Sequence, residues 1–161
     1  PVAAVKEALT TQHHTAQEKA DLLARLSGGC LGWAIMALQD ESRLSERAEK
    51  LADISRLCSA TRHDRLAYAA DLAVMFGKGR DKVSDVLSAW LQWWRDLLLI
   101  KCGNSRWIVN VDHEPVLSQQ AEALTAAAIS AFMHEIRATA VELEQNANPR
   151  LALEVLMLTM P

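Results

Sequence analysis

Long runs without glycine or proline constrain this chain more than any other feature of its sequence. Only six glycines and four prolines occur in 161 residues. Between them, stretches rich in alanine, leucine, glutamate and arginine repeat their apolar residues every three to four positions, which is the period of an α-helix. We therefore predict an all-α fold. Only residues 107–111, which are rich in β-branched side chains, look extended, and they are too few to build a sheet.

Turn formers and helix caps divide the chain into a series of predicted helices. Ser27-Gly28-Gly29 ends a helix whose Leu22, Leu23 and Leu26 are expected to face inward, and residues 40–42 offer caps for another helix that reaches Cys58. The predicted ranges are 2–10, 15–26, 31–38, 42–58, 62–76, 80–102, 115–124, 125–146 and a last helix from residue 149. Residues 1–40 form a small first unit in this interpretation, and residues 41–161 form a helical bundle.

The final stretch, QNANPRLALEVLMLTMP (Gln145–Pro161), begins as a helix and then becomes almost wholly apolar. Asn148 can cap this helix, and Pro149 at the first helical position gives up an N–H that has no partner there. After Arg150, only Glu154 and Thr159 are polar, so apolar residues surround the helix, which is typical of burial on more than one side. About a dozen residues are too few for a membrane span, which needs roughly 20. The sequence leaves two alternatives: a central core helix, or a helix shared with another subunit through Leu151, Val155 and Leu158.

The predicted helix 80–102 carries three tryptophans in the stretch SAWLQWWRDLLLIK. Trp90 and Trp94 lie four residues apart, so they share one helix face, whereas Arg95 and Asp96 point elsewhere. A cluster of tryptophans can line a ligand site or build a core. Because these lie among leucines at helical spacing, we predict that Trp90, Trp94 and Arg95 organise the structure rather than bind a ligand.

Composition and charge argue against several classes of function. The net charge is −3, with both signs mixed along the chain, so nothing indicates binding to a phosphate backbone. The three cysteines lie far apart without a C-x-x-C motif, which favours reduced thiols in the cytoplasm. The chain starts at Pro1 without an initiator methionine, and we therefore expect it to be a fragment of a longer protein.

No motif in the sequence predicts catalysis, a metal or a cofactor. Gly77-Lys78-Gly79-Arg80 lacks the spacing of a phosphate-binding P-loop and is expected to be a turn between helices. The histidines are expected to lie on the surface, because none has the paired spacing of a metal site. The acidic candidates for acid–base chemistry cannot be placed in a pocket from sequence. The residues considered are His13, His14, Cys58, His63, His134 and Glu135 as ligands, and Asp64, Asp71, Asp112 and Glu114 as acids or bases.

Several stretches taken in order resemble one protein family. LLARLSGGCLGWAIMAL (Leu22–Leu38) is similar to the end of the helical lid domain in bacterial AAA+ clamp-loader proteins. WLQWWRDLLLIK (Trp90–Lys101), IVNVD (Ile108–Asp112) and NANPRLALEVLML (Asn146–Leu158) together resemble the C-terminal collar domain of the DNA polymerase III delta-prime family. One departure concerns ATP: Gly32 occupies the position of the sensor arginine found in the ATP-binding tau/gamma-type members.

The resemblance implies a lid remnant over residues 1–40 and a collar-type helical bundle over residues 41–161. It implies a non-catalytic oligomerisation module of the cytoplasmic, bacterial replicative clamp loader, with no cofactor, that contacts the tau/gamma and delta subunits through the collar. The sliding clamp and primer-template DNA would be reached only through missing domains. Two alternatives from the residues alone remain: a stand-alone helical ligand-binding or regulatory domain with a tryptophan-lined cavity, and a metal enzyme that uses His63 and His134.

Overall fold

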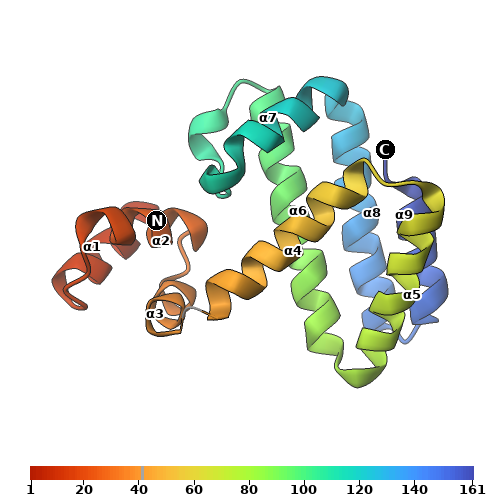
Figure 1. The fold of residues 1–161 in the computed structure, drawn as a ribbon, viewed down its shortest axis with the longest axis horizontal. Coiled ribbons are helices and arrows are strands. Elements are labelled where there is room, and N and C mark those ends of the chain that lie inside the picture. The colour runs from red at the N-terminus through yellow and green to blue at the C-terminus, as the bar shows by residue number, and fades with distance from the viewer. Residues whose placement is uncertain (41) are drawn as a thin grey trace.

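The computed structural model describes residues 1–40 and 42–161, and these form helices and short 3-10 turns without a β-strand among them (Figure 1). The all-α prediction is confirmed, and the helix boundaries lie within two residues of the predicted ones. The helices are α1 (Val2–Thr11), α2 (Gln17–Leu26), α3 (Leu31–Gln39), α4 (Ser42–Cys58), α5 (Arg62–Lys78), α6 (Arg80–Lys101), α7 (Glu114–Ala123), α8 (Ala126–Glu144) and α9 (Pro149–Thr159). Two 3-10 turns, η1 (Ser105–Trp107) and η2 (Val111–His113), lie between α6 and α7.

The predicted cap before α4 is partly visible. The Asp40 carboxylate accepts a hydrogen bond of 2.9 Å from the backbone N–H of Ser42 and so satisfies a donor at the start of the helix. Residue 41, which belonged to this predicted cap and began the predicted second domain, lies outside the described residues. The division of the chain into domains at this point therefore stays a prediction.

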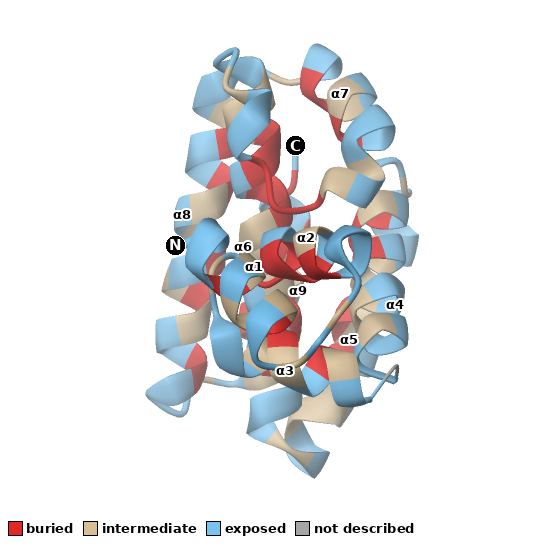
Figure 2. Cartoon of the chain, turned by 90° about the vertical axis from the view of Figure 1, so that its left-hand side faces the viewer, coloured by how far each residue is buried: buried red, intermediate tan, exposed pale blue. Residues whose placement is uncertain are grey.

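The buried side chains form two separate hydrophobic cores. The smaller core lies within α1–α3, which we call the N-terminal unit, and it contains Val5, Leu9, Ala20, Leu23, Ala24, Ala34 and Ala37. The larger core draws on α4–α9 and includes all three tryptophans of α6. Figure 2 shows the buried residues facing the inside of each group of helices. Leu22 was predicted to face inward but is 41% exposed, because α2 presents a narrower apolar stripe than three neighbouring leucines suggest.

Helix α6 is the central element of the larger bundle. It packs against α4, α5, α7 and α8, and α9 lies between α5 and α8 on the far side from the N-terminal unit (Figure 1). Helix α4 connects the two cores: Leu44 packs on the smaller one, and Leu51, Ile54 and Leu57 are buried in the larger one. The N-terminal unit is therefore carried on the first half of α4.

The segment between α6 and α7 is not the short extended stretch that the sequence indicated. Gly103, with φ of +72°, ends α6 in the left-handed conformation that glycine adopts most readily. The chain then turns through η1 and η2, and Ile108 between them has extended backbone angles. Ile108 and Val109 are buried, whereas Trp107 is 60% exposed. Their β-branched side chains thus reflect packing against the bundle rather than strand pairing.

Candidate functional site

The start of α9 has the cap that the sequence predicted. Asn148 Oδ1 accepts a hydrogen bond of 3.2 Å from the backbone N–H of Leu151, and Pro149 is the first helical residue. Arg150 and Glu154 form an ion pair of 2.8 Å along the helix surface. Because both partners are accessible to solvent, the pair supports the helix only weakly.

Helix α9 has one buried face and one exposed apolar face. The buried face packs on α5 and α8 and consists of Ala152, Leu153, Leu156 and Met157. On the other face, Leu151 is 61% exposed, Val155 49% and Leu158 55%. These three residues lie at spacings of four and three, so they form one stripe, which we call the α9 outer face. The tail is thus not a core helix buried on all sides.

The far end of α9 is anchored by one side chain of α5. The Arg65 guanidinium donates hydrogen bonds to the backbone oxygens of Leu57 and Cys58, at the end of α4, and to those of Met160 and Pro161. The carbonyls at the end of a helix have no partner within the helix, so a cation there stabilises them. With a side-chain cap at its start and this anchor at its end, α9 presents its outer face on a well-defined backbone.

The tryptophans of α6 join the central helix to three different neighbours. Trp90 stacks on Tyr68 of α5 with ring centroids 5.9 Å apart, and Trp94 packs on Phe132 of α8 at 4.6 Å. Trp93, which was not singled out from the sequence, meets His113 edge to face at 5.6 Å and donates a hydrogen bond of 3.0 Å to Gln120 of α7. All three are fully buried. This placement supports the structural role predicted for Trp90 and Trp94.

The three tryptophans differ in hydrogen bonding, and we expect this difference to appear in stability. Trp93 Nε1 has Gln120 as acceptor, whereas the buried Nε1 groups of Trp90 and Trp94 have no acceptor within the described chain. Each change to phenylalanine removes a similar apolar area, but Trp93→Phe also leaves Gln120 Oε1 unpaired. We expect Trp93→Phe to cost about 1–2 kcal/mol more than Trp94→Phe. Urea unfolding followed by circular dichroism measures both variants, and equal losses would contradict the expectation.

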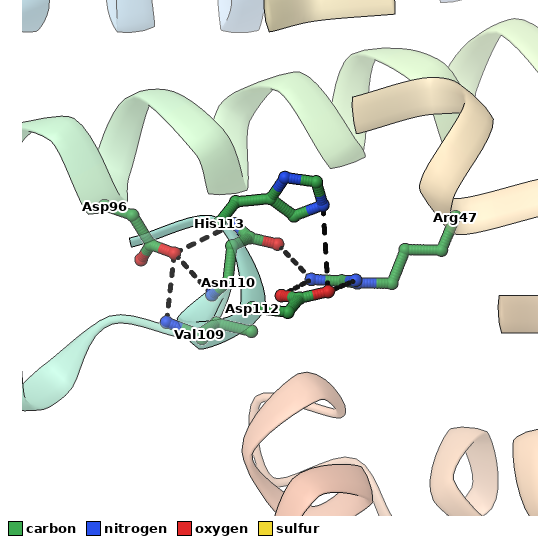
Figure 3. A network of polar contacts seen from close by, with 6 residues as sticks. All are labelled: Arg47, Asp96, Val109, Asn110, Asp112 and His113. Atoms are coloured by element: carbon green, nitrogen blue, oxygen red, sulfur yellow. Dashed lines mark hydrogen bonds and ion pairs between the residues drawn. The ribbon is translucent and has the colours of Figure 1, made fainter. Parts of the chain in front are cut away.

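Arg95 and Asp96 lie next to each other in sequence but in different surroundings. Arg95 is 46% exposed at its side chain and contacts the Asp96 carboxylate at 3.2 Å, while Asp96 is fully buried. Asp96 Oδ2 accepts hydrogen bonds from the backbone N–H of Val109 and from both the backbone and side-chain N–H groups of Asn110, at 2.8–3.0 Å (Figure 3). Burial raises the pKa of Asp96, and these donors together with Arg95 oppose that effect. Asp96 therefore fixes the segment 108–110 against α6.

Gly32 is exposed in the first turn of α3, and a Cβ atom built there would meet nothing within 4 Å. Packing therefore does not require glycine at this position, and an arginine side chain would find open space. Whether the position corresponds to a sensor arginine stays a prediction.

The other sequence candidates do not assemble into a site. Within residues 1–40 and 42–161, no group of three or more His, Cys, Asp or Glu side chains is placed to hold a metal ion. His63 is exposed on α5 and His134 is exposed on α8. Likewise, no helix in the described ranges is both long and apolar enough to cross a bilayer.

Three surface hollows bear on the tryptophan-lined cavity that the ligand-binding alternative requires. One of them, of about 250 Å³, lies between the ends of α5 and α8 and the start of α6, and it is lined by Phe76, Arg80, Asp81, Ser84, Leu87, Ala140, Leu143 and Glu144. None of the three is lined by Trp90, Trp93 or Trp94. These hollows therefore give no support to a tryptophan-lined ligand site, and we take the α9 outer face as the candidate functional surface.

Comparison with known proteins identifies a family. The family model described as DNA polymerase III, delta subunit, C terminal matches residues 57–160, which is more than half of the chain. The matched region runs from the end of α4 through α9 and leaves out the N-terminal unit. No curated protein and no solved structure matches significantly.

Proposed function

The chain belongs to the family of C-terminal domains of the DNA polymerase III delta subunit, and from this premise we propose that it is a non-catalytic assembly module of the bacterial clamp loader. In this role it takes part in DNA replication by joining other clamp-loader subunits, and it acts in the cytoplasm. Its contribution is a binding surface on a rigid bundle rather than a chemical step.

The observation that carries this proposal is the exposure of the α9 outer face. Leu151, Val155 and Leu158 lie on one stripe and are each about half exposed or more. Burying an apolar side chain of this size completely contributes roughly 1.5–3 kcal/mol. Because these residues are half exposed in the single chain, binding a partner would supply part of that free energy. Association costs are of similar size, so a stable complex also needs contacts from neighbouring helices. An apolar stripe at this spacing fits a partner helix with a matching stripe.

Within the family, we place the chain with the delta-prime type. The order of the motifs at Leu22–Leu38, Trp90–Lys101 and Asn146–Leu158 supports this placement, as does glycine at position 32 in place of a sensor arginine. On the same grounds, residues 1–40 are the end of a lid domain and residues 41–161 are the collar. The presence of two separate hydrophobic cores agrees with that division. The expected partners are the tau/gamma and delta collars, with the sliding clamp and primer-template DNA bound by other domains.

The proposal predicts that the α9 outer face is required for association. We expect the chain to form a mixed complex with the tau/gamma collar of the same organism, detected by light scattering after size exclusion. Leu151→Asp and Leu158→Asp place a charge within the stripe and should each weaken the complex at least about 10-fold, because an unpaired charge at an apolar interface must be desolvated. Both positions are exposed, so the monomer should remain folded, as circular dichroism can verify.

The matched control for these variants is Val116→Asp. Val116 is a partly exposed valine on α7, whereas α9 packs on α5 and α8 (Figure 1), and the change adds the same charge to the same protein. It should leave the complex intact. A folded wild-type monomer that ignores the collar at micromolar concentration would overturn the proposed function, and equal loss in all three variants would remove α9 as the contact surface.

A further inference from the structure

The position of the N-terminal unit depends on a stretch of α4 with few apolar anchors. Leu44 packs against the smaller core and Leu51 belongs to the larger one, so the residues between them span the gap between two hydrophobic cores. Arg47 lies in the middle of this span. In Figure 1, the first half of α4 extends out of the bundle toward α3, and the segment between α6 and α7 lies next to α7 on the side of the bundle that faces the N-terminal unit.

Arg47 connects this span to the segment after α6. Its guanidinium makes two hydrogen bonds to the Asp112 carboxylate, of 2.8 and 3.1 Å, and one of 2.5 Å to Asn110 Oδ1 (Figure 3). The Arg47 side chain is only 12% exposed, which sets this ion pair apart from the surface pairs elsewhere in the chain. Partial burial raises the pKa of Asp112, but Arg47 outweighs it and holds the pKa below its usual value. We call Arg47 with Asn110 and Asp112 the Arg47 brace.

The other end of the brace is fixed in the larger core. Asn110 is fully buried and donates through both its backbone and side-chain N–H groups to Asp96 Oδ2 of α6, each at 2.8 Å. The same residue thus accepts from α4 and donates to α6. A continuous chain of hydrogen bonds therefore runs from α4 through residues 110–112 to the central helix.

Gly28 of the N-terminal unit lies close to α6 and to the segment after it. At Gly28, with φ of +58°, an added Cβ would lie 3.3 Å from the Gln92 amide and 3.9 Å from Val109. Next to this approach is a hollow of about 340 Å³, with Leu26, Ser27 and Trp33 on one wall and Arg43, Lys50 and Asp85 on another. A partly polar cleft therefore lies between parts of the two units. A continuous apolar interface would fix their relative angle more firmly than such a cleft does.

We propose that the Arg47 brace is a conformational latch that sets the angle between the N-terminal unit and the bundle. When the brace is intact, α4 is held against residues 110–112 and the units keep one arrangement. When it is broken, the cleft opens and a second, detached arrangement becomes populated. This inference goes beyond the proposed assembly role and does not depend on it, because the brace residues are not part of the α9 outer face.

Electron spin resonance distance measurements on the full chain test this inference. One label is attached at Gln12→Cys, at the exposed end of α1, and the other at the native Cys102 after α6, with Cys30→Ser removing the thiol in the cleft. Cys58 stays unlabelled near neutral pH, because burial raises its pKa to about 11 and a thiol of that pKa is almost wholly protonated. The intact protein should give one narrow distance distribution.

Breaking the brace should broaden that distribution or add a second distance. Arg47→Met keeps the aliphatic stem and the helix propensity, and Asp112→Asn keeps the size of the partner while removing its charge. In both variants, the population of the detached arrangement should rise about 10-fold or more relative to the intact protein. A change of this size is expected for the loss of a charged hydrogen-bond pair. Circular dichroism establishes that each variant is folded.

Arg43→Met is the matched control, since Arg43 lies one turn earlier on α4 and its charge acts on the exposed Asp40 carboxylate rather than on residues 110–112. It should leave the distribution narrow. If the distance distribution stays unchanged in both brace variants, the proposed latch is wrong. It is also wrong if the intact protein already gives a broad distribution. Equal broadening in Arg43→Met would also overturn it, because the effect would then be general to α4.

Discussion

Replacing Asp96 with alanine is expected to lower the free energy of unfolding by about 3–5 kcal/mol, the range seen when one partner of a buried polar cluster is removed. The carboxylate of Asp96 is the common acceptor for Val109 and for two N–H groups of Asn110. Without it, these donors stay buried with no acceptor, and Arg95 loses its charge partner. Urea unfolding monitored by tryptophan fluorescence measures the loss.

Two further variants test whether the acceptor atoms cause this effect. Asp96→Asn retains one oxygen that can accept, so it should cost clearly less than Asp96→Ala. Arg95→Ala removes the exposed partner only and should change stability by less than about 1 kcal/mol, as is usual for accessible ion pairs. If Arg95→Ala proved as costly as Asp96→Ala, the charge pair rather than the buried hydrogen bonds would be responsible.

Replacing Arg65 with methionine should destabilise the protein by about 2–4 kcal/mol, because several charge-assisted hydrogen bonds are lost at once. Arg65 joins the last carbonyls of α4 to Met160 and Pro161, and methionine keeps only the apolar part of the side chain. The effect should be greatest in the last turn of α9. Hydrogen exchange should therefore accelerate there more than at the capped start near Asn148.

The control for this variant is Arg62→Met, in the exposed first turn of α5. It removes the same charge from the same helix without touching α9, so it should stay within about 0.5 kcal/mol of the wild type. Uniformly faster exchange throughout α9 and α5 in Arg65→Met would contradict a local anchor, because it would indicate general loosening of the bundle.

The helices could be predicted because the information that specifies them is local. Apolar periodicity, together with caps such as Asn148 and breaks such as Gly79, lies within a few residues of each boundary. The turn predicted over Gly77–Arg80 is shorter than expected, because α5 continues through Gly77 and Lys78. The stripe of Leu151, Val155 and Leu158 could be named in advance for the same reason, since helical spacing alone places these residues on one side. That this stripe is exposed could be learned only from the structure, because the sequence of a helix that is apolar all round does not show which side faces the core.

The errors share a different physical cause. Leu22 and residues 107–111 were interpreted from residue type, yet their surroundings are decided by how α2 and α6 pack. The pairing of Arg47 with Asp112 joins residues 65 positions apart, and Asp96 meets Asn110 across the end of a helix. A single sequence does not indicate which residues pair across such separations. The acidic residue inside the leucine-rich stretch of α6 was the one available sign that Asp96 is buried with donors around it.

The packing of α9 between α5 and α8 has a consequence for the order in which the chain acquires its structure. The contacts within α1–α3 join residues close in sequence, so that core can form early during synthesis. The larger core cannot close until α9 has left the ribosome, because α5 pairs with a helix more than 70 residues further along the chain. Until then the nascent bundle exposes the apolar side of α5, and this is the stage at which aggregation or chaperone binding competes with folding.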